Sequence, residues 1–154
     1  VNRGIRGYQT GLLLENLDAH LYGGAVDKIV LLIGTNDIGK DLPVNEVLNN
    51  LEAIIQSIAR DYPLTEMKLL SILPVNEGEE YKQTVYIRTN EKIQKWNQAY
   101  QELASAYMQV EFVPVFDSLT DQEGQLKKDY TTDGLHLSVL GYQVLTKALK
   151  DYLF

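Results

Sequence analysis

Short, continuous apolar segments alternate along the chain with longer segments whose apolar residues recur every three or four positions. The continuous segments Lys28–Ile33, Met67–Leu73 and Val110–Phe116 are typical of strands that are covered on both faces of a sheet. Pro114 lies within the third segment, which indicates an edge strand or the end of a strand. Val1–Ile5 is a weaker strand candidate, so the pattern predicts four strands.

The periodic segments predict amphipathic helices, because such spacing places the apolar residues on one helical face. These helices span Thr10–Leu21, Asn45–Tyr62, Thr84–Tyr107 and a C-terminal segment that begins after Ser138. Thr10 and Ser138 are predicted to cap helices, and Gly23–Gly24 is predicted to stop the first one. The last helix has an expected buried stripe made of Tyr142, Leu145, Leu149 and Tyr152.

This alternation of strands and helices indicates an α/β fold with a parallel sheet and right-handed crossovers. We expect residues 1–154 to form a single domain, because no linker, repeat or low-complexity stretch interrupts the pattern. Ligands of such folds bind beyond the carboxyl ends of the strands. The loops that follow the predicted strands are therefore the places in which to look for function.

Composition and charge exclude several functions. The 154 residues contain 14 Lys and Arg against 21 Asp and Glu, which gives a formal charge of −7. Nucleic acids and anionic membrane surfaces are therefore not expected partners. The absence of Cys removes disulfides and thiolate chemistry, and the two His leave little for a metal site. The longest apolar run, Ile29–Ile33, is far shorter than the roughly 20 residues of a membrane-spanning helix. No phosphate-binding glycine loop is found either, so nucleotide binding is not expected.

Three loops at the predicted strand ends carry groups of chemical interest. They are Gly4–Gly7, Gly34–Asp37 and Thr132–Ser138. Each of these segments taken singly is ordinary turn or cap chemistry. Because the carboxyl ends of parallel strands meet at one edge of a sheet, the three loops are expected to lie together.

Together these loops contain what acyl transfer requires, which is an oriented base and donors for an oxyanion. Asp133 and His136 lie on one short loop, so the carboxylate can hold the Nδ1–H of the imidazole while Nε2 faces the sheet. Asn36 has a side-chain NH₂ group, and Gly7 can present its backbone N–H without an obstructing Cβ. We therefore regard these four residues as candidate site residues.

The set Gly4-x-x-Gly7, Gly34-Thr-Asn-Asp37 and Asp133-x-x-His136 resembles the SGNH (GDSL-like) hydrolase superfamily, especially the branch similar to platelet-activating-factor acetylhydrolase. The likeness spans the whole chain and implies a flavodoxin-like three-layer α/β/α fold. It also implies roles for the four candidates. Gly7 and Asn36 would be oxyanion donors, Asp133 the orienting carboxylate and His136 the general base.

The Gly-Asp-Ser block, which carries the nucleophile in that superfamily, has no counterpart in this sequence. The five serines all lie at positions better explained by structure, namely Ser57, Ser71, Ser105, Ser118 and Ser138. We therefore expect the natural protein to have a further N-terminal strand, nucleophile turn and helix, so that the first strand of the fold is missing here. An unpaired inner strand edge would invite aggregation. The 154-residue chain alone is expected to be inactive.

The leading hypothesis is a serine esterase that cleaves a small acyl ester, such as an acetyl ester, without metal or organic cofactor. The alternative is a binding or scaffold subunit that has the same fold but no nucleophile. A flavodoxin-like signalling module would need an acidic phosphoacceptor cluster or flavin loops, which the sequence lacks. We expect a small acyl ester as the partner and a cytoplasmic location, and a homodimer is left open.

Overall fold

The computed structural model describes residues 1–21 and 24–154, which contain a parallel sheet with the strand order β1-β2-β3. The strands are β1 (Lys28–Leu31), β2 (Glu66–Leu70) and β3 (Val110–Val113). Each observed strand overlaps one of the three continuous apolar segments, and both strand pairs are parallel. The predicted α/β class is therefore confirmed. The strand β3 ends directly before Pro114, as its position indicated.

The helices between and around these strands are mostly those that the periodic segments predict. They are α1 (Thr10–Glu15), α2 (Leu17–His20), α3 (Thr35–Gly39), α4 (Val44–Asp61), α5 (Lys82–Val85), α6 (Asn90–Ser105) and α7 (Val139–Leu153). Three short 3-10 turns are η1 (Glu79–Tyr81), η2 (Asp117–Leu119) and η3 (Lys128–Tyr130). Ser138 caps α7, since its hydroxyl accepts a hydrogen bond from Gly141 N at 3.2 Å. None of the helices in the described part of the chain is long and apolar enough to cross a membrane.

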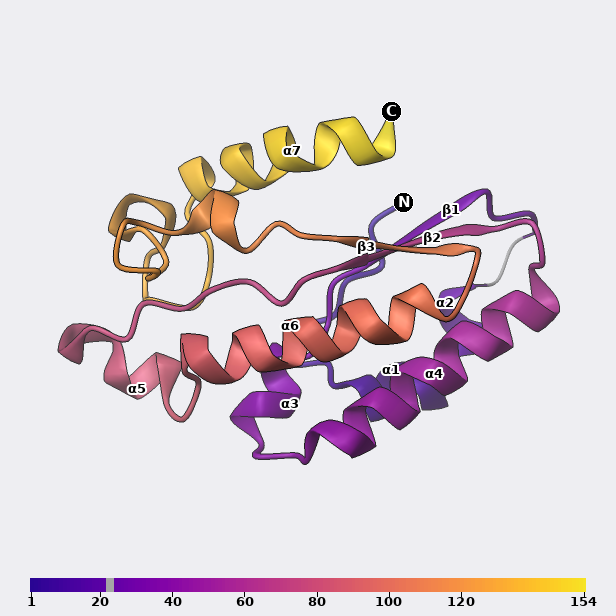
Figure 1. The fold of residues 1–154 in the computed structure, drawn as a ribbon, viewed down its shortest axis with the longest axis horizontal. Coiled ribbons are helices and arrows are strands. Elements are labelled where there is room, and N and C mark those ends of the chain that lie inside the picture. The colour runs from indigo at the N-terminus through magenta and orange to yellow at the C-terminus, as the bar shows by residue number, and fades with distance from the viewer. Residues whose placement is uncertain (22–23) are drawn as a thin grey trace.

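Helices cover both faces of the sheet, with α7 on one side and α1, α4 and α6 on the other (Figure 1). The larger core lies on the side of α4 and α6 and includes Leu51, Ile54, Met67, Ile93 and Trp96. The smaller core joins β2 and β3 to α7 through Leu70, Val113, Val115 and Leu145. This arrangement is the expected three-layer α/β/α fold. The loops that follow the strands gather on the left side of Figure 1.

The weak strand predicted at Val1–Ile5 is wrong, because these residues are exposed and form no ladder. A strand needs a neighbour for its backbone groups, whereas Gly4 N donates locally to the side chain of Asn2 at 2.8 Å. Beside this segment, β1 pairs only with β2 among the described strands, so its other edge is free. A groove of about 900 Å³ lies between them and is lined by Val1–Ile5, β1 and Tyr142.

The free side of β1 leaves apolar surface in this groove. Val30 and Leu32 are 44% and 45% exposed, although the continuous pattern of this segment predicted cover on both faces. Tyr142 was expected in the buried stripe of α7, but it is 60% exposed because it faces the same groove. In contrast, Leu145 is buried as predicted.

Two predicted helices are interrupted. The segment Thr10–Leu21 divides into α1 and α2 at Asn16, whose side-chain amide donates to the carbonyl of Leu12 at 2.9 Å. The segment Thr84–Tyr107 breaks between α5 and α6, where Tyr86 adopts a positive φ of 58°. Thr10 is the first residue of α1 and not its cap. The signal predicted to stop the first helix is Gly23–Gly24, and Gly23 lies outside the described residues.

Candidate functional site

Asp133 and His136 lie in the loop before α7, and their side chains are in contact. The distance from His136 Nδ1 to Asp133 Oδ2 is 2.7 Å. The other carboxylate oxygen, Asp133 Oδ1, accepts hydrogen bonds from the backbone N–H of His136 at 2.8 Å and of Leu135 at 3.0 Å. Since an ionised carboxylate only accepts hydrogen bonds, Nδ1 carries the proton and Nε2 keeps its lone pair. The carboxylate therefore sets both the tautomer and the direction of the ring.

The charge of Asp133 is stabilised by the same contacts. Partial burial raises the pKa of its carboxyl, but the hydrogen bonds from His136 and Leu135 outweigh burial and hold the pKa below its usual range. The side chain of His136 is 62% exposed. An ionised partner and an accessible Nε2 are the properties that a general base requires.

The loop that carries this pair is closed by local contacts. Thr131 forms an antiparallel bridge with Leu137, and its hydroxyl donates to the carbonyl of His136 at 2.7 Å. The backbone N–H of Gly134 donates to the same hydroxyl at 2.9 Å. Gly134 has a φ of 85°, and a Cβ there would lie 2.5 Å from Cβ of Tyr81. Only glycine fits this turn without displacing Tyr81, so Gly134 is needed for the loop that orients Asp133.

Asn36 lies in the first turn of α3, just beyond the carboxyl end of β1. Gly34, with a φ of 126°, makes the sharp turn from the strand into this helix. The side-chain Nδ2 of Asn36 donates a hydrogen bond to the carbonyl of Tyr8 at 3.0 Å. Because an amide has two N–H donors, the second remains for a ligand once the first has fixed the group.

This hydrogen bond places the Gly7 loop beside Asn36, because Gly7 is the residue before Tyr8. Gly7 has a φ of 78°, and no heavy atom lies within 4 Å of the position that a Cβ would occupy. The predicted backbone donor and the predicted amide donor are therefore neighbours in the structure.

Asp37, in α3, connects this helix with the segment that follows Gly7. Its carboxylate is fully buried and accepts hydrogen bonds from Thr10 Oγ1 at 2.6 Å and from Thr10 N at 3.1 Å. Burial raises the pKa of Asp37, and the bonds from Thr10 partly oppose that rise. These hydrogen bonds brace the loop between β1 and α3. The sequence predicts Thr10 as a helix cap and therefore does not identify it as the partner of Asp37.

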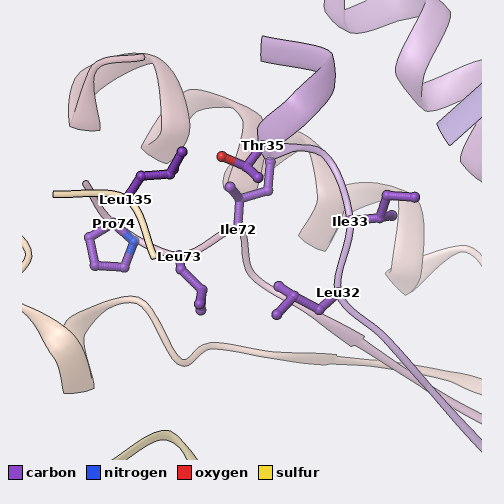
Figure 2. Close-up of a pocket in the computed structure, with 7 residues that line it drawn as sticks. All are labelled: Leu32, Ile33, Thr35, Ile72, Leu73, Pro74 and Leu135. Carbon is purple, nitrogen blue, oxygen red and sulfur yellow. The ribbon is translucent and has the colours of Figure 1, made fainter. Parts of the chain in front are cut away.

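Figure 2 shows that Thr35 and Leu135 lie at the same small apolar cavity, beyond the ends of β1 and β2. The cavity has a volume of about 80 Å³ and is lined by Leu32, Ile33, Thr35, Ile72, Leu73, Pro74 and Leu135. Thr35 immediately precedes Asn36, and Leu135 immediately precedes His136. The structure thus brings all three predicted loops to one edge of the sheet.

Across residues 1–21 and 24–154, no three or more His, Asp and Glu side chains are arranged to hold a metal ion. Ser71 is buried, and its hydroxyl accepts hydrogen bonds from Val115 N at 3.0 Å and Phe116 N at 3.1 Å. Ser71 and the cap residue Ser138 therefore have the structural roles that the sequence predicted.

Replacing Gly34 with Ala is expected to destabilise the protein by roughly 2–4 kcal/mol. An added Cβ would overlap the hydroxyl of Tyr100 and lie 2.8 Å from Cδ1 of Ile72, and φ would stay in the left-handed region. Tyr100 cannot yield easily, because it is fully buried and its hydroxyl donates to the carbonyl of Ile33 at 3.0 Å. Urea unfolding of both proteins measures the difference.

The matched control is Gly124→Ala. Gly124 also has a positive φ, of 75°, but nothing lies within 4 Å of its Cβ position. Its substitution adds backbone strain without a clash and is expected to cost about 1 kcal/mol. Equal losses for the two variants would show that the contact with Tyr100 does not restrict Gly34.

The chain is similar to a known protein family and to several solved structures. The model of the GDSL-like lipase/acylhydrolase family matches residues 1–144. A solved protein from Streptococcus pneumoniae, described as a candidate platelet activating factor, is 88% identical, with a TM-score of 0.98. That match covers 100% of this chain and 72% of the other. No curated protein matches the chain.

More distant structures share the fold. A candidate acylhydrolase from Bacteroides fragilis is 20% identical with a TM-score of 0.84, over 99% of this chain and 73% of the other. An acetylxylan esterase from Geobacillus stearothermophilus is 18% identical with a TM-score of 0.79, over 100% of this chain and 72% of the other. The family model covers nearly the whole chain and agrees with the resemblance of the motifs to the SGNH hydrolases. The chain therefore belongs to the GDSL-like lipase/acylhydrolase family.

Proposed function

We propose that the chain supplies the general base and the oxyanion hole of a serine esterase that cleaves a small acyl ester. The observation that carries this proposal is the contact of 2.7 Å between His136 Nδ1 and Asp133 Oδ2. It leaves Nε2 able to take a proton from a serine hydroxyl and to return it to a leaving alcohol. Asn36 and Gly7, joined through Tyr8, supply the donors for the oxyanion.

The proposed reaction has two halves. In the first, the serine oxygen bonds to the ester carbonyl carbon while Nε2 of His136 takes the hydroxyl proton, and the oxyanion binds Asn36 and Gly7. The proton then passes to the alcohol oxygen as the ester C–O bond breaks, which leaves an acyl-enzyme. In the second half, water attacks the acyl carbon, Nε2 takes its proton, and the proton returns to the serine as the carboxylic acid leaves.

The nucleophile is proposed to lie on a segment outside these 154 residues that pairs with the free edge of β1. Three features support this placement: the groove of about 900 Å³, the half-exposed Val30 and Leu32 that line it, and the free backbone groups of β1. A strand added parallel to β1 would end at the same edge of the sheet as Asn36. Its following turn would then carry the serine to the site.

The acyl group is proposed to be short, such as acetyl. The apolar cavity between Thr35 and Leu135 is small, with a volume of about 80 Å³ (Figure 2). A cavity of this size suits a methyl or ethyl group better than a long alkyl chain. The acetylxylan esterase among the structural relatives is likewise named for an acetyl ester.

The test uses an extended protein, in which this chain is joined to the part of the Streptococcus pneumoniae relative that lies outside the matched region. We expect the extended protein to hydrolyse p-nitrophenyl acetate faster than the octanoate and to be labelled by a fluorophosphonate on a serine of the added part. The 154-residue chain alone is expected to do neither. An extended protein that folds but is neither labelled nor active would support the alternative of a non-catalytic binding subunit.

Replacing Asn36 with Ala in the extended protein is expected to lower kcat about 10²- to 10³-fold with little change in KM. The lost N–H would bind the oxyanion only in the transition state, so ground-state binding is retained. Steady-state kinetics with p-nitrophenyl acetate measure the effect. Asn49→Ala, which removes an exposed amide from α4, serves as the control and is expected to leave kcat unchanged. A loss of less than threefold in kcat for Asn36→Ala would remove this side chain from the oxyanion hole.

A further inference from the structure

Arg88 is a buried cation that holds the segment on which Asn36 lies. Its exposed fraction is 8%. Its Nε donates to the carbonyl of Thr35 at 2.9 Å and lies 3.1 Å from Thr35 Oγ1. Its Nη1 donates to the carbonyls of Thr84 at 3.4 Å and Val85 at 3.2 Å. The guanidinium therefore bridges the first residue of α3 and the end of α5.

The environment of this cation is unusual, because its hydrogen-bond acceptors are all neutral. Within the described ranges, 1–21 and 24–154, no carboxylate lies at ion-pair distance from Arg88. Burial without a counter-charge lowers its pKa, and an apolar side chain would fill the same space at less cost. Packing alone is therefore a poor explanation of this side chain.

Two backbone features make room for the contact between Arg88 and Thr35. The turn between α5 and α6 places Tyr86 at φ 58° and ψ −119°, a region that residues with a Cβ rarely adopt. This turn breaks the predicted helix and directs Arg88 inward. At the other end of the contact, a Cβ on Gly39 would lie 2.7 Å from Cζ of Arg88. A strained turn and a residue without a side chain thus both serve the Arg88–Thr35 contact.

We propose that Arg88 is a positioning residue for the oxyanion hole, an inference that rests on the proposed esterase function. By holding both the carbonyl and the hydroxyl of Thr35, it fixes the backbone from which the Asn36 side chain departs. The carbonyl of Tyr8 fixes the far end of that side chain at 3.0 Å. The direction of the free amide N–H is therefore set from two sides. Because this N–H acts on the transition state, its misplacement lowers kcat and leaves KM nearly unchanged.

The first test replaces Arg88 with Met in the extended protein. The expected result is a decrease of about 10- to 100-fold in kcat with KM within about threefold, since small misplacements of catalytic groups have effects of this size. Arg88→Lys keeps the charge but not the forked donor geometry, and its kcat is expected to stay within about threefold of that of Arg88→Met.

The matched control is Lys92→Met. Lys92, on α6, pairs with Asp41 just beyond α3 at 3.4 Å, so this variant also removes a cationic contact between these elements, but it does not touch Thr35. Its kcat is expected to change less than about twofold, as is usual for an exposed ion pair. The inference is overturned if Arg88→Met lowers kcat no more than this control, or if KM rises as much as kcat falls. If Arg88→Met does not fold, Gly39→Ala tests the same contact with Arg88 retained and is expected to lower kcat in the same direction.

A second measurement separates this inference from the proposed function. The amides of Ile38 and Lys40 donate to the carbonyls of Gly34 at 3.1 Å and Asn36 at 3.0 Å, so their hydrogen exchange reports on α3. Arg88→Met is expected to accelerate their exchange about 10-fold or more while the amides of β3 keep their rates. Faster exchange in a protein without esterase activity would overturn the proposed function and leave Arg88 with only the structural role of holding α3. Unchanged exchange would overturn the positioning role, whatever the activity.

Discussion

Replacing His136 with Ala in the extended protein is expected to lower kcat for p-nitrophenyl acetate by roughly 10⁴- to 10⁶-fold. Without Nε2, no group of this loop can take the serine proton or return it to the alcohol. Asn36 and Gly7 would still bind the oxyanion, so a slow residual reaction is expected to remain. Single-turnover and steady-state kinetics measure both the loss and the residual rate.

The free energy of unfolding is the control measurement for His136→Ala. The ring of His136 is largely exposed and contacts Asp133, so its removal is expected to change the free energy of unfolding by less than about 1 kcal/mol. A folded His136→Ala protein with the activity of the unsubstituted extended protein would contradict the proposed mechanism. The rate of labelling by a fluorophosphonate is a second measurement. In His136→Ala, labelling of the serine is expected to slow in parallel with kcat.

Replacing Asp133 with Asn is expected to lower kcat about 10⁴-fold while the loop keeps its shape. The amide oxygen of Asn can still accept the hydrogen bonds from the backbone N–H groups of Leu135 and His136. In the unsubstituted protein these bonds measure 3.0 and 2.8 Å. The NH₂ group of Asn, however, would donate to Nδ1 of His136 and so favour the tautomer with the proton on Nε2. That tautomer cannot act as a base toward the serine.

Nitrogen NMR of the imidazole checks the cause of this loss, because the protonated ring nitrogen is expected to change from Nδ1 to Nε2 in Asp133→Asn. The double variant Asp133→Asn, His136→Ala is expected to be no slower than His136→Ala, since residues that act as a unit are not additive. If the two decreases in kcat multiply in the double variant, Asp133 does not act through His136.

The fold could be predicted where burial dominates the pattern. The three continuous apolar segments became strands, and the periodic segment that contains Leu51 and Ile54 became α4 with both residues buried. The prediction failed at Val1–Ile5 and Tyr142, which both line the groove beside β1. Alternating or periodic apolar residues show that a segment can be covered, but the neighbour that covers it is not part of the pattern.

The candidate site was predicted best where it is local in sequence. The spacing of three residues between Asp133 and His136 suffices for their contact, so the pair could be inferred before the structure was known. Arg88 and Thr10 were missed for the opposite reason. Their partners, Thr35 and Asp37, lie 53 and 27 positions away, and an arginine in a periodic segment usually marks the solvent side of a helix.

The closed loop of residues 131–137 has a consequence for how the enzyme could be assembled. Its bridge and its hydrogen bonds at Thr131, Asp133 and His136 join residues at most six positions apart, so little chain entropy is lost in forming them. The acid–base pair can therefore reach its working geometry early in folding, independently of the strand that would bring the serine. On the proposed mechanism, alignment of the nucleophile, and not orientation of the imidazole, would then be the later step in forming the active site.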